Sequence, residues 1–235
     1  PRVSHEEIKR ISPRSIDATN RDFDPILTRE TLQKRGFLAK NVVRHHYRAF
    51  DLRWLYYEHE TNLLQRRSPD YFPHVQKGNL WLASQQKPVR EWTVPYCLQS
   101  IGCLDVLFPS ASFFPLYLYD TARQGQLGMF ETEPHPVNGR RPNLSDQAQA
   151  YLAGFELTPE DGAEPLFYHT MAILHSPAYR VENAGALRQD WPRVPLPKTR
   201  DALETSAALG RQVAALLDVE TPVPGVTQGD PRADL

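Results

Sequence analysis

The stretch AILHSPAYRVENAGALRQDWPRVPLP, residues 172–197, carries the densest set of structural signals in this chain. An apolar helix end precedes Ser176-Pro177, and this pair begins the next helix, because serine caps a helix N-terminus and proline suits the first turn. That second helix ends near Gly185. The chain then leaves through the rigid, proline-rich run Trp191–Pro197. The stretch therefore predicts two helices separated by a capped break and followed by an extended segment.

Outward from this stretch, the second half of the chain is predicted to be helical. The longest predicted helix has apolar side chains on one side, as expected when one face packs on a core; they are Leu203, Leu209, Val213, Leu216 and Leu217. The pattern predicts helices over residues 145–153, 164–175, 177–184 and 201–217.

The first half is predicted to be mixed and rich in strands. Val, Tyr, Phe and Trp concentrate between Asn41 and Tyr57, which favours two strands around a turn at Phe50-Asp51. Further strands are predicted over residues 79–84, 92–101, 104–108 and 116–119, and helices near Ser4 and over 28–35, the latter closed by Gly36. The fold class is α+β, a strand-rich mixed first half followed by a helical second half. We expect four segments: a strand-rich subdomain (1–121), a linker or loop (122–143), a helical subdomain (144–220) and a flexible tail (221–235).

Composition restricts the kind of protein. The chain has 235 residues, of which 40% are hydrophobic and 23% charged, enough for one large domain or two small ones. It begins at Pro1, so we expect a fragment or a processed chain. No apolar run approaches the roughly 18 residues needed to span a membrane. Cys97 and Cys103 fit two buried thiols rather than a disulfide or zinc framework. We therefore expect a soluble, cytoplasmic protein without a membrane partner.

Charge is distributed unevenly along the chain. Residues 29–90 contain twelve basic and five acidic side chains and four of the eight histidines, whereas residues 91–235 contain ten basic and eighteen acidic side chains. A basic segment suits a polyanion such as nucleic acid, because contacts with phosphates release counterions. The alternative is that these charges spread over several solvated faces.

Two further blocks complete a family resemblance. They are YRAFDLRWLYYE (47–58) and FPLYLY (114–119). Together with residues 172–197, they resemble the C-terminal target-recognition domain of Type ISP restriction–modification enzymes and of their adenine-specific DNA methyltransferase relatives. The chain departs from the usual family pattern at Ala49, where proline is common, and at residues 168–171.

The resemblance implies a DNA sequence-recognition domain that positions an upstream methyltransferase domain of the same polypeptide on duplex DNA. That upstream domain would use S-adenosylmethionine as its cofactor, and the parent would be an adenine-specific DNA methyltransferase, with nuclease and translocase domains in the full Type ISP architecture. The chain itself contains no Asn/Asp-Pro-Pro-aromatic motif and no glycine-rich S-adenosylmethionine or ATP loop. We therefore expect no catalytic residue, no cofactor and no metal in this chain.

Candidate DNA contacts lie mainly in the basic segment. Around the turn, Arg48 or Arg53 would grip a phosphate while Asp51 fixes the guanidinium plane; the alternative is a purely structural turn. The window Ser84–Glu91 concentrates the side-chain types that read bases, although it would also suit a solvated loop. The complete set of expected DNA-binding residues is Arg48, Arg53, Arg66, Arg67, His74, Lys77, Asn79, Gln85, Gln86, Lys87 and Arg90.

Two other hypotheses stay open at this stage. The chain would be a protein–protein docking module if its amphipathic 201–217 helix binds a partner domain and no part touches DNA. It would be a hydrolase if it held an unfamiliar catalytic site, which isolated turnover of DNA with magnesium would reveal.

Overall fold

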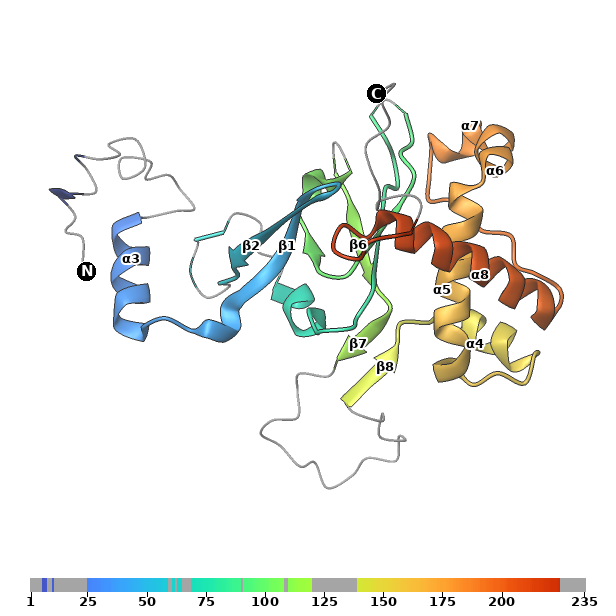
Figure 1. Ribbon diagram of the computed structural model, residues 1–235, viewed down its shortest axis with the longest axis horizontal. Coiled ribbons are helices and arrows are strands. Elements are labelled where there is room, and N and C mark those ends of the chain that lie inside the picture. The colour runs from blue at the N-terminus through green and yellow to red at the C-terminus, as the bar shows by residue number, and fades with distance from the viewer. Residues whose placement is uncertain are drawn as a thin grey trace. The chain divides into compact units, whose positions relative to one another are not determined.

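The structure is a computed structural model that describes residues 6–7, 10, 25–58, 61, 63–64, 69–89, 91–107, 110–119 and 139–224. The chain forms two compact units. The first comprises Pro1–Val43 and Trp54–Phe72, and the second comprises Arg44–Arg53 and Pro73–Leu235. These units divide the chain differently from the four segments expected from composition. Strands dominate the first half and helices the second, so the predicted α+β class is confirmed (Figure 1).

The first unit is built around helix α3 (Pro25–Arg35), which ends at Gly36 with φ +82°, as the sequence predicted. The guanidinium of Arg35 donates to Glu58 Oε1 at 2.9 Å, and Glu58 has no exposed surface. A short 3₁₀ helix, η1 (Ala39–Asn41), follows, and its last carbonyl accepts from the Tyr57 amide at 2.7 Å. The helix predicted near Ser4 lies almost entirely outside the described residues.

Strands β1 (Val42–Arg48) and β2 (Asp51–Tyr56) confirm the two strands and the turn predicted over 41–57. Phe50 closes the turn in the left-handed region, at φ +60°. The sheet order is β2-β1-β5, in which β5 (Ile101–Gly102) pairs in parallel with β1. The hairpin tip (residues 44–53) belongs to the second unit, and the pairing of β1 with β5 joins it to the rest of that unit.

A second sheet, in the order β4-β3-β6, is antiparallel throughout. It consists of β3 (Trp81–Ser84), β4 (Tyr96–Leu98) and β6 (Ser112–Pro115). Trp81 on the central strand has no exposed surface. The strand predicted over 104–108 is wrong at its start, where the chain forms the 3₁₀ helix η3 (Leu104–Val106). The physical reason is that a short apolar run becomes buried in either conformation, so hydrophobicity alone cannot separate them.

The end of the expected linker takes part in a further ribbon. Strand β8 (Arg140–Pro142) pairs antiparallel with β7 (Tyr117–Tyr119), with Leu118 opposite Arg141. The 3₁₀ helix η2 (Pro69–His74) lies earlier in the chain and brings His74 to this ribbon, because His74 Nδ1 accepts from the Tyr119 amide at 3.0 Å.

The helical half has a polar cap at each major N-terminus. Ser145, Thr158, Ser176 and Thr199 each accept a hydrogen bond from a backbone amide in the first turn of the following helix, which satisfies one of the amides a helix start leaves free. The helices are α4 (Asp146–Ala153), α5 (Pro159–His175), α6 (Pro177–Glu182), α7 (Ala184–Leu187) and α8 (Arg200–Leu217). Helix α5 begins five residues before its predicted start and runs through Pro165.

Helices α5 and α8 cross closely at Gly210. A Cβ atom at this position would lie 1.8 Å from the Tyr168 carbonyl oxygen, so only glycine fits. Leu203 and Ala207 of α8 are fully buried. The close crossing therefore supplies the centre of the helical half.

Candidate functional site

The hairpin tip presents an exposed cluster of aromatic and cationic side chains. Arg53 forms two hydrogen bonds with Asp51, from Nε at 2.8 Å and from Nη2 at 2.6 Å. Its guanidinium also lies 4.3 Å from the centre of the Tyr47 ring, and that of Arg48 lies 5.5 Å from it. The bond with Arg53 lowers the pKa of the Asp51 carboxyl, so this pair is charged at neutral pH. Two arginine side chains are therefore held in place at an exposed turn.

The turn after η2 separates an exposed cation from a buried amide. Lys77 is exposed and precedes Gly78, whose φ of +85° is one that glycine adopts readily. Asn79 has no exposed surface, and its Nδ2 donates to the carbonyls of His74 and Tyr117, both at 2.9 Å. Its Oδ1 accepts from the Tyr117 amide at 3.1 Å. The side chain of Asn79 thus joins the turn to β7, and only Lys77 points a free charge to the surface.

The loop after β3 also contains one buried polar side chain next to exposed polar side chains. Gln85 is buried, its Nε2 donates to the Leu107 carbonyl at 3.3 Å, and its Oε1 accepts from the Thr93 amide at 3.4 Å. Gln86 and Lys87 are exposed. Gln86 Nε2 donates to Asp190 Oδ1 at 3.1 Å.

The eleven expected DNA-binding residues therefore fall into three groups. The exposed ones are Arg48, Arg53, Lys77, Gln86 and Lys87. The side chains of His74, Asn79 and Gln85 form hydrogen bonds with backbone groups of neighbouring segments. Arg66, Arg67 and Arg90 lie outside the described residues.

The sequence interpretation missed two sets of polar side chains. Asp190 meets Gln86 from a segment 104 residues away, which no local pattern signals. Arg140 stacks over the Tyr117 ring at 3.9 Å, and Arg141 beside it is exposed. The adjacent pair of arginines was a visible signal, but it lay in the stretch expected to be a linker or loop (122–143), and neither residue was among the expected contacts.

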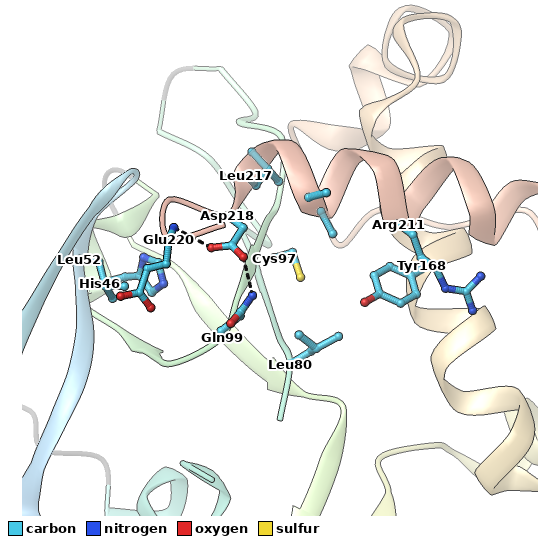
Figure 2. Close-up of a pocket in the computed structure, with 12 residues that line it drawn as sticks. His46, Leu52, Leu80, Cys97, Gln99, Tyr168, Arg211, Leu217, Asp218 and Glu220 are labelled. Atoms are coloured by element: carbon cyan, nitrogen blue, oxygen red, sulfur yellow. Dashed lines mark hydrogen bonds between the residues drawn. The ribbon is translucent and has the colours of Figure 1, made fainter. Parts of the chain in front are cut away.

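A pocket of about 220 Å³ lies where the end of α8 meets β1 and β4 (Figure 2). Gln99 donates to Asp218 Oδ2 at 2.8 Å, and Arg44 pairs with Glu220 at 2.5 Å, so polar side chains fasten the end of α8 to the strands. Its lining is His46, Leu52, Leu80, Cys97, Gln99, Tyr168, Arg211, Ala214, Ala215, Leu217, Asp218 and Glu220.

The titratable groups of this pocket are poorly suited to catalysis. Burial, assisted by the neighbouring His45, lowers the pKa of His46 to about 4, which makes its imidazole a weak base. Burial raises the pKa of the Cys97 thiol and of the Tyr168 hydroxyl, in each case to about 12. The thiolate, which is the reactive form, is therefore scarce at neutral pH. We interpret the pocket as a packing junction.

Within the described ranges, no group of three or more His, Cys, Asp or Glu side chains is placed to hold a metal ion. Among the helices in those ranges, none combines the length and the apolar character needed to cross a membrane.

The distinctive stretch at 172–197 is structural. His169 donates from Nε2 to the Pro195 carbonyl at 2.9 Å, and its Nδ1 accepts from the Ser206 hydroxyl at 2.8 Å, because a carbonyl can only accept. The hydroxyls of Tyr151 and Tyr179 donate to the carbonyls of Pro197 and Arg193, both at 2.9 Å. These bonds fasten the proline-rich run, whose prolines lack the amides that ordinary secondary structure uses.

Comparison with solved structures finds the same fold in DNA-bound proteins. The cryoEM structure of a DrdV–DNA complex matches with a TM-score of 0.58 and 25% identity, over 82% of this chain and 17% of that one. A nuclease-deletion mutant of the Type ISP restriction-modification enzyme LlaGI, in complex with a DNA substrate mimic, matches with a TM-score of 0.53 and 21% identity, over 77% and 14%. The ATP-dependent Type ISP restriction-modification enzyme LlaBIII bound to DNA matches with a TM-score of 0.54 and 16% identity, over 91% and 14%.

The chain spans only 14–17% of the length of these three proteins. No curated protein matches its sequence. The family model of the Type ISP C-terminal specificity domain matches residues 4–232. Because that match covers nearly the whole chain, the chain belongs to the family of Type ISP C-terminal specificity domains.

Proposed function

We propose that this chain recognises a specific sequence in duplex DNA for a restriction–modification enzyme. The observation that carries the proposal is the separation of roles in two loops, the turn after η2 and the loop after β3. Each loop places an exposed cation or amide beside a buried polar side chain that is bonded to backbone. Rigid presentation of such groups is what sequence recognition requires, because phosphate contacts fix the register and base contacts discriminate.

In this proposal, the cations act on phosphates. Arg48, Arg53, Lys77 and Lys87 are exposed. A planar arginine that is stacked on tyrosine and bonded to a carboxylate loses less side-chain freedom when it contacts a phosphate. The family and the DNA-bound structures of similar fold support this assignment. Arg66, Arg67 and Arg90 remain predicted contacts of the same kind.

The proposal extends to the rest of the enzyme. We propose that a methyltransferase domain of the same polypeptide, using S-adenosylmethionine, acts on the DNA that this domain selects, and that it does so in the cytoplasm. The residues described here do not fit that cofactor, since the chain lacks the glycine-rich strand-to-helix turn it needs. The contribution of this chain is therefore to bind and orient DNA.

The test is fluorescence anisotropy of the chain with a mixed-sequence duplex over a salt series. We expect binding that weakens steeply with salt, and a triple variant with Arg53→Ala, Lys77→Ala and Lys87→Ala should lower the salt slope by about 1 for each phosphate contact removed.

The matched control is Arg200→Ala. Arg200 is exposed at the first turn of α8, and the 18 residues of this helix separate it from the end that touches the strands by roughly 25 Å. This control should bind as the unchanged chain does. Binding that is tight at every salt concentration, or absent at low salt, would contradict the proposal.

A second function is favoured by one feature of α8. Leu209 and Leu216, seven residues apart on one face, are 55% and 46% exposed, and Val219, just beyond the end of the helix, is 39% exposed. Because the chain covers only 14–17% of the proteins of similar fold, we propose that the partner of this face is the methyltransferase domain of the same polypeptide. Charged substitutions at Leu209 and Leu216 that abolish its capture, while DNA binding by the chain persists, would establish this docking role.

A further inference from the structure

The contact between Gln86 and Asp190 has a chemical consequence beyond holding two segments together. Both side chains are exposed, and Gln86 Nε2 lies 3.1 Å from Asp190 Oδ1. Both belong to the second compact unit. The pair therefore lies at the surface of a single unit, and its Gln86 belongs to the window that the sequence indicated for base reading.

The carboxylate determines which way the amide of Gln86 faces. An ionised carboxylate only accepts hydrogen bonds, so the amide nitrogen, rather than the oxygen, must face Asp190. One of the two Nε2 hydrogens is used in this bond. The second hydrogen and the Oε1 lone pairs stay available on the exposed side chain. Asp190 thus converts a freely rotating amide into a donor and an acceptor with a fixed order.

Asp190 is itself held in place. Its Oδ1 also accepts from the Trp191 amide at 2.8 Å. The Trp191 ring packs edge-to-face on Phe114, with ring centres 5.3 Å apart. Phe114 lies on β6 opposite Leu82 of β3, and β3 leads directly into the loop that carries Gln86. Both ends of the contact are therefore anchored to the same sheet.

The carboxylate is charged under ordinary conditions. The hydrogen bond from Gln86, with further help from the Trp191 amide, lowers the pKa of Asp190. At neutral pH the group is an acceptor only.

We propose that Gln86 reads one adenine in the major groove of the target and that Asp190 is the residue that positions it. The Hoogsteen edge of adenine offers the N6 amino group as donor and N7 as acceptor, and a glutamine amide satisfies both at once through Oε1 and Nε2. Guanine offers two acceptors at this edge, so it would leave the Oε1 of a fixed amide facing an oxygen. This inference rests on the proposed DNA recognition and adds the base and the residues.

A purely structural role for the contact makes a different prediction. If Gln86 and Asp190 only fasten the loop, their removal weakens all sequences alike or lowers stability. If they read a base, their removal changes the preference at one position and leaves the other positions unchanged. The measurement must therefore report base preference rather than affinity alone.

The experiment is selection of bound duplexes from a randomised library by the 235-residue chain, followed by sequencing. With Gln86→Ala, we expect the preference for adenine over the other bases at one position to fall by roughly 5- to 150-fold, the range for one bidentate base contact. Asp190→Ala should weaken the preference at that same position, and Asp190→Asn should restore part of it through the amide oxygen. Gln86→Arg should shift the preference there toward guanine, since the new guanidinium pairs with Asp190 and can bond to both guanine acceptors.

The matched control is Gln189→Ala, which removes an exposed glutamine next to Asp190 and should leave every position unchanged. If the unchanged chain enriches a sequence but Gln86→Ala enriches the same one, the adenine assignment is overturned and the proposed function stands. If the unchanged chain enriches no sequence and binds no duplex, both are overturned.

Discussion

The α5–α8 pair with its proline-rich run and the loops of the strand-rich half use the same kinds of side chain for opposite purposes. In the helical half, His169 is 2% exposed and both its ring nitrogens bond to neighbouring groups. In the hairpin tip, Arg53 is exposed and its bonds to Asp51 leave it accessible to a ligand. Polar groups thus support the fold in one region and present a surface in the other.

The most distinctive sequence of this chain lies in its supporting structure. The stretch at 172–197 is the most recognisable part of the chain, yet its capping and carbonyl-binding groups are structural. The proposed recognition groups lie in short loops with little sequence signature. Within those loops, adjacent residues differ in exposure. Gln85 is buried and forms hydrogen bonds with backbone groups, whereas Gln86 is exposed. Variants of buried and of exposed residues should therefore affect stability and DNA binding differently.

The largest expected effect is at the helix crossing. In Gly210→Ala, the new methyl would clash with the Tyr168 carbonyl, so α5 and α8 must move apart. We expect a loss of about 1–3 kcal/mol or more in unfolding free energy, measured by urea denaturation. Gly185→Ala is the control, because nothing lies within 4 Å of a Cβ there, and its stability should change little. Equal stability of the two variants would show that the crossing is looser than described.

A smaller effect is expected in the turn after η2, where Asn79 and Lys77 should have different roles. Asn79→Ala removes two buried hydrogen bonds and one part-buried hydrogen bond, and leaves backbone groups of His74 and Tyr117 without their partner atoms. We expect a loss of about 1–3 kcal/mol in unfolding free energy. Lys77→Ala, two residues away and exposed, should change stability by less than about 0.5 kcal/mol while weakening DNA binding. If Lys77→Ala lowered the unfolding free energy more than Asn79→Ala does, the assignment of Asn79 to structure and of Lys77 to DNA binding would be wrong.

The smallest effect is a pH dependence in the packing junction. The folded-state pKa of His46 is about 4, below its ordinary value of 6.5, so the unfolded chain binds more protons between these values. Its contribution to stability is therefore complete above pH 6.5 and is lost as the pH falls toward 4. His45 and His175, whose pKa values burial also lowers, add to the same trend.

Urea unfolding at pH 7 and pH 5 measures this dependence. We expect a smaller loss of stability between the two pH values in His46→Phe than in the unchanged chain. Asp51→Asn serves as control, since the lowered pKa of that exposed carboxyl lies below this window. An unchanged pH dependence in His46→Phe would mean that folding does not lower the pKa of His46.

Much of the local structure was predictable because its causes are local. Ser145 and Ser176 cap helices at the positions that the sequence indicated, and Gly36 ends α3 with positive φ. The hairpin at Phe50 followed from β-favouring residues on both sides of a turn. Caps and turns depend on atoms only a few residues apart, so the sequence contains all the information they need.

The burial of the predicted site residues could not be read from the sequence, because it depends on distant segments. The window 84–91 was predicted to lie between two strands, and the predicted DNA contacts included Asn79 and Gln85, which the structure buries. Strand β8 was missed because Arg140–Pro142 pairs with β7 across 20 intervening residues and has no strand signature of its own.

The α+β layout, the helix caps, the hairpin turn and the family resemblance follow from the sequence. The packed fold is needed to see that Gln85 faces Leu107 while Gln86 faces Asp190, and that the Tyr168 carbonyl requires glycine at position 210. Burial and hydrogen-bond partners depend on which distant segments the packed core brings together. Local propensity determines which segments form helices and strands. Long-range contacts determine whether a polar side chain is buried in the structure or exposed to a ligand.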